Sequence, residues 1–183
     1  MIYLSIAECG KSHSDQHDTA HKILSSLLCQ LGHKDHLICK EDNGRPYVSI
    51  KDTDISISHS RNLAVVCVAN LDTTELDTDC LIALPIEAKR IGIDIEYIDK
   101  NADLNAKNRL AKRFLSKEAS SIEEFFSIWT ENEAVGKLTG EGVIQSSSAH
   151  CSIISFIITL NDSNDEYSLS IAYSDRGSKE DAV

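Results

Sequence analysis

The sequence has no uninterrupted apolar run of the roughly 18 residues that a membrane-spanning helix requires. Its longest apolar stretch, Ile153–Leu160, is broken by Ser155 and Thr159. The first residues (MIYLSIAECGK) carry no basic residue ahead of the apolar ones, and their apolar stretch is too short for a secretory signal. We therefore expect a soluble, cytoplasmic protein with no membrane partner.

The cysteines form no CxxC pair and no cluster with the spacing of metal ligands. The six of them, several inside apolar runs, are Cys9, Cys29, Cys39, Cys67, Cys80 and Cys151. This pattern indicates reduced, buried thiols of a cytosolic protein rather than disulfides.

Basic residues are also few. The 183 residues include 18 Lys and Arg against 29 Asp and Glu, a net charge of −11. Because neutralisation of phosphates supplies most of the affinity for nucleic acid, we expect no general nucleic-acid binding. Any anionic ligand must be held by a local basic patch. With 42% hydrophobic and 26% charged residues, the composition is that of a globular protein of one domain or two small lobes.

The spacing of apolar residues predicts strands mixed with helices. Strands are expected at Ile2–Ala7, on both sides of a polar loop at 58–62, at Leu81–Ile86, at Arg90–Glu96, and in a hairpin of Cys151–Leu160 with Tyr167–Tyr173. Helices are expected at Thr19–Leu31, Ser121–Trp129 and Thr130–Leu138. Leu71–Asp79 reads as a surface loop and the residues from Ser174 as a tail. We predict an α+β fold of two similar lobes, residues 1–89 and 90–183, although no clear sequence repeat relates them.

Two acidic residues stand out in Ile91–Glu96 (IGIDIE). The isoleucines alternate with Gly92, Asp94 and Glu96, the period-two pattern of a strand buried on one face only. Asp94 and Glu96 would then point the same way, close enough to share one cation. An ordinary solvated face of a strand would show the same pattern.

A third acid and a lysine lie in Trp129–Gly142 (WTENEAVGKLTGEG). Thr130 followed by Glu133 predicts a helix start, with Glu133 and Lys137 one turn apart on one face. Glu133 could simply complete a capping box, or form a surface pair with Lys137. The four residues together favour a phosphate site, because magnesium is held by carboxylates, substrate phosphates and water. Lys137 would then meet the phosphate oxygen on which charge grows during transfer.

Three further segments each have an ordinary explanation and a functional one. Ser58-His59-Ser60 offers hydroxyls, an imidazole and backbone amides to a phosphate, although a lone histidine is more often a surface residue. Gly44-Arg45-Pro46 alone indicates only a turn. The segment Leu104–Lys117 carries five cations and no acid, which suits either a solubilising face or a patch that attracts an acidic protein.

Five motifs in order resemble those of 4'-phosphopantetheinyl transferases. They are GRP at 44–46, ISISHS at 55–60, IGIDIE at 91–96, RFLSKEA at 113–119 and WTENEAVGKLTGEG at 129–142. The likeness is to the surfactin-synthetase-activating type, a monomer built as a pseudo-dimer of two α+β lobes. It is weaker to the small trimeric holo-acyl-carrier-protein synthase.

The resemblance implies a reaction. The 4'-phosphopantetheine group of coenzyme A would pass to a serine of an apo acyl or peptidyl carrier protein, with release of adenosine 3',5'-bisphosphate. The implied magnesium ligands, which also bind the pyrophosphate, are Asp94, Glu96 and Glu133. Glu133 is in addition the candidate base for the serine, and Lys137 would neutralise or protonate the leaving pyrophosphate.

The resemblance also implies contacts with coenzyme A and the carrier protein. Ser58 and His59 would contact a phosphate, and Arg45 with Pro46 would lie beside the adenine. The carrier protein would dock near Lys107–Lys117.

The sequence departs from the family at two places. Ser12–Lys22 is rich in histidine where relatives often carry lysine and arginine, which predicts weaker or differently placed recognition of the 3'-phosphate, with Arg61 a candidate to compensate. Asn132 stands where a lysine is common, which removes a cation but no proposed ligand.

Two alternative functions share these residues. Another magnesium-dependent phosphoryl-transfer enzyme, such as a small nucleotide hydrolase, would leave the basic segment and Ser58-His59-Ser60 unexplained. A non-catalytic relative that binds coenzyme A or a carrier protein would have no reason to retain the complete set of Asp94, Glu96, Glu133 and Lys137.

Overall fold

The computed structural model describes residues 1–70, 82–142 and 150–175. Its elements in chain order are β1 (Ile2–Glu8), α1 (His13–Gln30), β2 (Ile38–Lys40), β3 (Pro46–Val48), β4 (Thr53–Ser60), β5 (Leu63–Asn70), β6 (Ile82–Leu84), β7 (Arg90–Tyr97), α2 (Leu104–Leu115), α3 (Ile122–Thr139), β8 (Ser152–Thr159) and β9 (Glu166–Ser174). The predicted loop at Leu71–Asp79, Cys80 and the tail after residue 175 lie outside the described residues. None of the described helices is long and apolar enough to cross a membrane.

The strands form two main sheets and a small hairpin. The first sheet has the order β4-β5-β1-β6, the second β7-β9-β8, and β2 pairs with β3. In both main sheets a first strand (β1 or β7) is followed by helix and then by a hairpin (β4–β5 or β8–β9). The second strand of the hairpin pairs with the first strand, β5 with β1 and β9 with β7. The prediction of an α+β fold is confirmed, and both halves of the chain follow this strand order.

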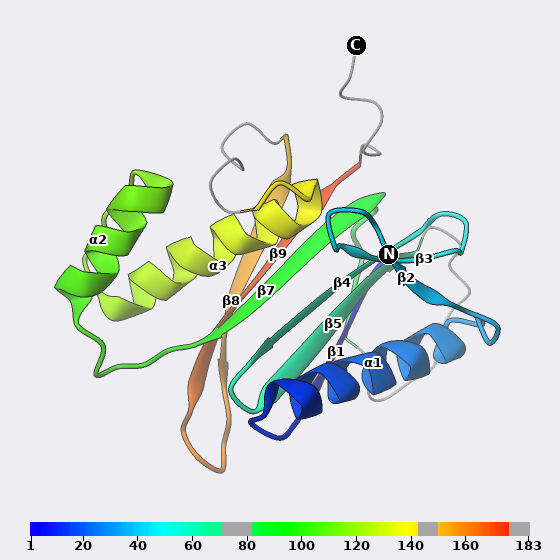
Figure 1. Cartoon of the computed structure of the whole chain (residues 1–183), viewed down its shortest axis with the longest axis horizontal. Helices are drawn as coiled ribbons and strands as arrows, with labels where there is room; N and C mark the ends of the chain where they lie inside the picture. Colours follow the sequence, from blue (N-terminus) through cyan, green and yellow to red (C-terminus); the bar gives the residue numbers. More distant parts are fainter. Residues whose placement is uncertain (71–81, 143–149, 176–183) are drawn as a thin grey trace.

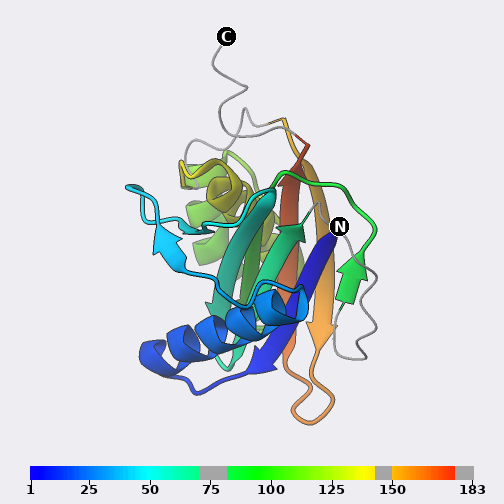
Figure 2. The ribbon, with the colours of Figure 1, turned by 90° about the vertical axis from the view of Figure 1, so that its right-hand side faces the viewer.

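One apolar core is common to both halves. It joins alternate residues of β1 and β5, such as Leu4 and Val65, to the isoleucines of β7 and to Ile171 of β9. Helix α1 packs on the other face of the first sheet, and α3 on the other face of the second. Figure 1 shows α1 and α3 on opposite sides of a strip where β4 and β7 run side by side, and Figure 2 shows α1 lying across the strands of the first sheet.

Helix α3 corrects one prediction. It is continuous from Ile122 to Thr139, and its N-cap is Ser121, whose hydroxyl accepts from the amide of Glu124. The predicted helix start at Thr130 is wrong. Thr130 is buried within the helix. Its hydroxyl donates to the carbonyl of Phe126, one turn earlier, instead of accepting from a backbone amide as a helix cap would. Glu133 therefore lies in the middle of a helix and completes no capping box.

Two other boundaries differ from prediction. Helix α1 begins at His13, six residues before Thr19, because Ser12 caps it by accepting from the amide of Asp15. Strand β4 continues through Ser60, so Ser58-His59-Ser60 lies in a strand and the predicted loop is wrong. The turn itself is Arg61-Asn62, with Arg61 at φ 52°.

The cysteine prediction holds in part. The five cysteines that the structure describes are all free thiols. Only Cys67 is buried, and this burial raises its pKa, whereas Cys29 is exposed. The prediction of buried thiols is therefore wrong for Cys29.

Candidate functional site

Strands β4 and β7 are joined by side chains. Alternate residues of β4 point toward β7 and accept hydrogen bonds from its backbone amides. The bonds run from Ile91 to Asp54 Oδ2 (2.8 Å), from Ile93 to Ser56 Oγ (3.0 Å), from Ile95 to Ser58 Oγ (3.3 Å) and from Tyr97 to Ser60 Oγ (3.0 Å). We call these four bonds the β4–β7 ladder. It holds the two halves of the chain in one register.

The acidic face of β7 is covered by α3. A Cβ at Gly92 would overlap the carbonyl oxygen of Ala134 and the backbone of Leu138, so the glycine lets the helix approach closely. Asp94, two residues along on the same face, is consequently only 5% exposed. The expectation that β7 is buried on one face only is wrong, because the side that carries the acids is buried too.

Asp94 has one saturated and one free oxygen. Its Oδ1 accepts from Ser58 Oγ at 2.9 Å and from Lys137 Nζ at 2.8 Å. Its Oδ2 is buried and has no hydrogen-bond partner among the described residues. Buried carboxylate oxygens are rarely left unpaired, so this atom marks a place where a positively charged ligand would be stabilised.

Glu96 and Glu133 complete the acidic cluster. Burial, and then the nearby charge of Asp94, raises the pKa of Glu96 to about 6, and Glu96 Oε2 accepts from Ser60 Oγ at 3.0 Å. The same two causes, in the same order, raise the pKa of Glu133. The charge of Asp94 therefore disfavours ionisation of Glu96 and Glu133, and a cation among the three acids would relieve that repulsion.

The cluster fits magnesium in its donor chemistry but not yet in its arrangement. No three His, Cys, Asp or Glu side chains of the described residues lie where they could hold a metal ion together. Instead the ammonium group of Lys137 lies beside Asp94. Since magnesium is commonly bound through one or two carboxylates plus substrate phosphates and water, the free Oδ2 of Asp94 and the neighbouring acids are suitable donors. The predicted three-residue ligand set remains a prediction.

Two adjoining hollows open over the β4–β7 ladder. The first, of about 400 Å³, is lined by the acidic cluster, by Ser58 and His59, and by residues of α1. The second, of about 310 Å³, is lined by the turn before β3, including Arg45 and Pro46, and by the end of α3. Both include Glu133 and Lys137. The structure thus brings the eight predicted site residues to these two hollows.

Histidines form the α1 side of the larger hollow. His17, His21 and His59 line it together with Lys40. The rings of His17 and His21 are 4.2 Å apart, and burial followed by the charge of His17 lowers the pKa of His21. Burial also lowers the pKa of His59, with His13 as the next cause. Sequence reasoning noted His17 and His21 only as a departure from the family, yet their spacing of four residues indicates one helix face.

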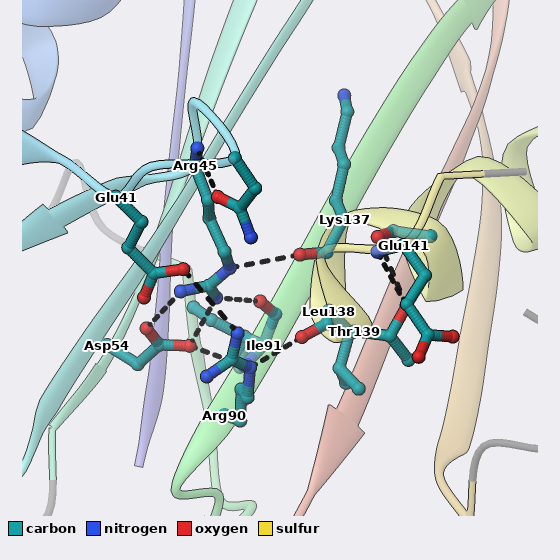
Figure 3. Close-up of polar contacts among 11 residues, drawn as sticks. Glu41, Arg45, Asp54, Arg90, Ile91, Lys137, Leu138, Thr139 and Glu141 are labelled. Atoms are coloured by element: carbon teal, nitrogen blue, oxygen red, sulfur yellow. Dashed lines mark hydrogen bonds and ion pairs between the residues drawn. The ribbon is translucent and has the colours of Figure 1, made fainter. Parts of the chain in front are cut away.

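The guanidinium of Arg45 binds protein groups rather than facing the hollow. It is 8% exposed and forms a two-bond pair with Asp54, at 2.9 and 2.7 Å. It also donates to the carbonyls of Lys137 (3.0 Å) and Ile91 (2.8 Å), as Figure 3 shows. Sequence reasoning missed Asp54, although its period-two spacing with Ser56 and Ser58 was a usable signal.

Two other predicted cations have partners within the chain. Arg61 lies over the ring of Tyr97, 3.3 Å from its centroid, and is not among the residues that line the larger hollow. The basic segment forms α2, where Lys107 lies over the rings of Phe125 and Phe126 and Lys112 pairs with Glu118 at 3.2 Å. Arg61 is therefore poorly placed to compensate at the hollow, and part of the basic charge is already paired.

The comparison with known proteins agrees with the motifs. No family model matches the chain. A curated relative from Nostoc sp., "4'-phosphopantetheinyl transferase HetI", is 31% identical over 117 residues. The resemblance to 4'-phosphopantetheinyl transferases is confirmed. The match covers 56% of this chain but only 41% of HetI, so the chain matches about two fifths of the length of its relative.

Proposed function

We propose that this protein transfers the 4'-phosphopantetheine group of coenzyme A to a serine of an apo acyl or peptidyl carrier protein. The observation that carries the proposal is the buried, half-satisfied carboxylate of Asp94, with Glu96, Glu133 and Lys137 around it. A site that selects a charged ligand leaves polar atoms unsatisfied until that ligand arrives. The named activity of HetI supports the same reaction.

In this proposal Asp94, Glu96 and Glu133 hold magnesium against the pyrophosphate. The ion supplies positive charge between the carboxylates and the phosphates. Lys137 then binds the phosphate, since its side chain is 32% exposed and lines the larger hollow. It is placed to neutralise the oxygen of the leaving adenosine 3',5'-bisphosphate.

The proton of the attacking serine goes to Glu133, directly or through water. Burial and the charge of Asp94 raise the pKa of Glu133, which makes its carboxylate a stronger base. The serine oxygen attacks the β-phosphorus of coenzyme A, and the bond from that phosphorus to the bridging oxygen breaks. The products are the phosphopantetheinyl carrier protein and adenosine 3',5'-bisphosphate.

The nucleotide end of coenzyme A occupies the two hollows. Pro46 and the backbone of the turn at 44–46 lie beside the adenine, because the guanidinium of Arg45 is already bound by Asp54. Ser58 and His59 contact a phosphate, and His17, His21 and Lys40 lie where the 3'-phosphate would be bound. Burial lowers the pKa of His21, and a neutral imidazole holds an anion weakly, so loss of the 3'-phosphate should change KM little near neutral pH.

An acidic carrier protein would dock on the basic segment Lys107–Lys117. The protein would act in the cytoplasm as a monomer whose two lobes, 1–89 and 90–183, form a pseudo-dimer. The pseudo-dimer is supported by the strand order that β1, β4 and β5 share with β7, β8 and β9. Two alternatives remain distinguishable: a magnesium-dependent nucleotide hydrolase, and a non-catalytic module that binds coenzyme A or a carrier protein.

Intact-mass spectrometry of a panel of apo carrier proteins tests the proposal. Each carrier is incubated with this protein, coenzyme A and magnesium. We expect one carrier to gain one phosphopantetheine group, and the gain to disappear with EDTA and with Glu133→Gln. Coenzyme A binding with no gain on any carrier would favour the non-catalytic module, and hydrolysis of coenzyme A without a carrier would favour the hydrolase.

A further inference from the structure

The serines of the β4–β7 ladder differ in their second hydrogen bond. Ser60 Oγ accepts from the amide of Tyr97 at 3.0 Å and donates to Glu96 Oε2 at 3.0 Å. Ser56 Oγ accepts from the amide of Ile93 at 3.0 Å and forms no hydrogen bond with a carboxylate of the described residues. The hydroxyl of Ser56 therefore joins the two strands, while that of Ser60 also contacts the acidic cluster.

The chemistry of a hydroxyl makes the bond of Ser60 directional. A serine has one proton to donate. Since the lone pairs of Ser60 Oγ already receive the Tyr97 amide, its proton is directed to Glu96 Oε2. No described residue donates a hydrogen bond to Oε1 of Glu96, which leaves that oxygen for an external ligand.

The position of Ser60 is itself fixed. It is the last residue of β4, beside the turn of Arg61 and Asn62. The carbonyl of Arg61 accepts from Gln16 Nε2 of α1 at 2.6 Å, and the carbonyl of Asn62 accepts from the amide of Cys9 at 2.8 Å. The turn is thus held in place by two contacts with the first half of the chain. Ser60, next to this turn, in turn holds Glu96 of the second half through its hydrogen bond.

We propose that Ser60 is a positioning residue that orients Glu96 for a divalent cation. The hydroxyl binds Oε2 and leaves Oε1 available, and Glu96 lines the larger hollow together with Asp94, whose Oδ2 has no partner among the described residues. Groups that orient a metal ligand in this way typically contribute roughly 10- to 100-fold to metal affinity or activity. The inference rests on the proposed role of Glu96 as a magnesium ligand.

The test compares Ser60→Ala with the matched control Ser56→Ala. Each variant removes one hydroxyl of the ladder that accepts a β7 amide, but only Ser60→Ala removes a bond to a carboxylate. Magnesium is titrated calorimetrically into each protein, with and without coenzyme A, and transfer is measured as a function of magnesium concentration. We expect Ser60→Ala to raise the Kd for magnesium about 10-fold or more. Ser56→Ala should leave that Kd unchanged, and Ser60→Ala should leave the KM for coenzyme A at saturating magnesium unchanged.

A second pair of variants separates orientation from folding. Ser60→Thr keeps the hydroxyl and Ser60→Val replaces it by a methyl group, while both β-branched residues suit a strand. Thermal unfolding followed by circular dichroism identifies any variant that does not fold. We expect Ser60→Thr to bind magnesium like the parent protein and Ser60→Val to resemble Ser60→Ala.

Several results would overturn the inference. Equal loss of magnesium affinity in Ser56→Ala and Ser60→Ala would show that the hydroxyl only joins the strands, and no loss in Ser60→Val would show that it does not orient Glu96. Failure of the parent protein to bind magnesium at all would also overturn it. If the parent protein binds magnesium with the expected dependence on Ser60 but modifies no carrier protein, the positioning role stands and the proposed transferase function fails.

Discussion

The β4–β7 ladder has an acid near each end, partly buried Asp54 and buried Asp94, and the hydrogen bonding of the two acids differs. At one end both oxygens of Asp54 are satisfied, by the two nitrogens of Arg45 and by the amide of Ile91. At the other end Asp94 receives two hydrogen bonds on Oδ1 and none on Oδ2 from any described residue. Both acids have a basic partner, yet only the first pair is complete.

The difference is between an ion pair that is complete within the protein and one that leaves a carboxylate oxygen without a partner among the described residues. The planar guanidinium of Arg45 binds a carboxylate through two parallel hydrogen bonds, and its other N–H groups donate to backbone carbonyls. Lys137 offers a single flexible charge that can leave Asp94 for another anion. A complete pair stabilises the fold, whereas an incomplete one retains affinity for a ligand.

The largest effect is expected at the incomplete pair. Asp94→Asn keeps the shape of the side chain but removes the charge that would hold magnesium. A loss of several kcal/mol of transition-state stabilisation corresponds to roughly 1000-fold in transfer rate. Carrier modification followed by mass spectrometry measures it, and a variant that still transfers at the parent rate would show that Asp94 is no magnesium ligand.

At the complete pair the effect should be on stability. Arg45→Met leaves Asp54 buried without its partner, and breaking a buried pair on one side costs about 3–5 kcal/mol of unfolding free energy. Urea unfolding measures the loss. The matched comparison is Lys137→Met, which should cost less because Lys137 is 32% exposed and Asp94 keeps its hydrogen bond from Ser58. Equal losses in the two variants would contradict the distinction between the pairs.

Lys137→Met should instead act on the reaction. Removing one group that stabilises charge in a transition state commonly lowers kcat by roughly 100-fold. We expect the KM for coenzyme A to change less than kcat, because the contact forms chiefly as the leaving group departs. Steady-state kinetics at saturating carrier protein distinguishes the two parameters. A raised KM with an unchanged kcat would make Lys137 a binding residue only.

The smallest effect is expected at the histidines. The pKa values of His21 and His59 are lowered, first by burial, so both are neutral at pH 7 and take up a proton only as the pH falls or an anion binds. The preference for adenosine 3',5'-bisphosphate over adenosine 5'-monophosphate should therefore grow between pH 7.5 and 6, by up to about tenfold per unit for each proton taken up. Calorimetry without magnesium measures it.

The control for this pH dependence is His21→Gln, which removes the histidine that has a lowered pKa and lies where we propose that the 3'-phosphate is bound. It should flatten the change in preference between the two nucleotides and leave binding at pH 7.5 nearly unaltered. A preference that is the same at both pH values in the parent protein would show that these histidines do not contact the 3'-phosphate.

Local patterns in the sequence predicted much of the site. The alternation in IGIDIE placed Asp94 and Glu96 on one face of a strand, and the spacing of Glu133 and Lys137 placed both on one helix face. In the structure these four residues line one hollow. That residues of β7 and α3 would lie together was predicted only from the two motifs taken in combination, because no single pattern relates β7 to α3.

The errors arose where distant contacts decide. Burial of Asp94 depends on α3 covering Gly92, which the alternation alone cannot show. Thr130 looks like a helix cap, but its hydroxyl also meets Ser168 and Ser170 of β9 in the core. The pairing of Arg45 with Asp54 joins a turn to a strand edge, and nothing local in GRP indicates where that side chain points.

Because side chains form the β4–β7 ladder, the sequence of β4 permits one alignment of the two strands. A slip of one residue would turn Ile55, Ile57 and His59 toward β7, and the apolar side chains would leave buried amides without acceptors. A slip of two would separate Asp54 from the amide of Ile91 and Ser58 from Asp94. An ordinary backbone-paired sheet tolerates most substitutions along its edge. Here the side chain of every second residue of β4 determines how the two halves of the chain are joined.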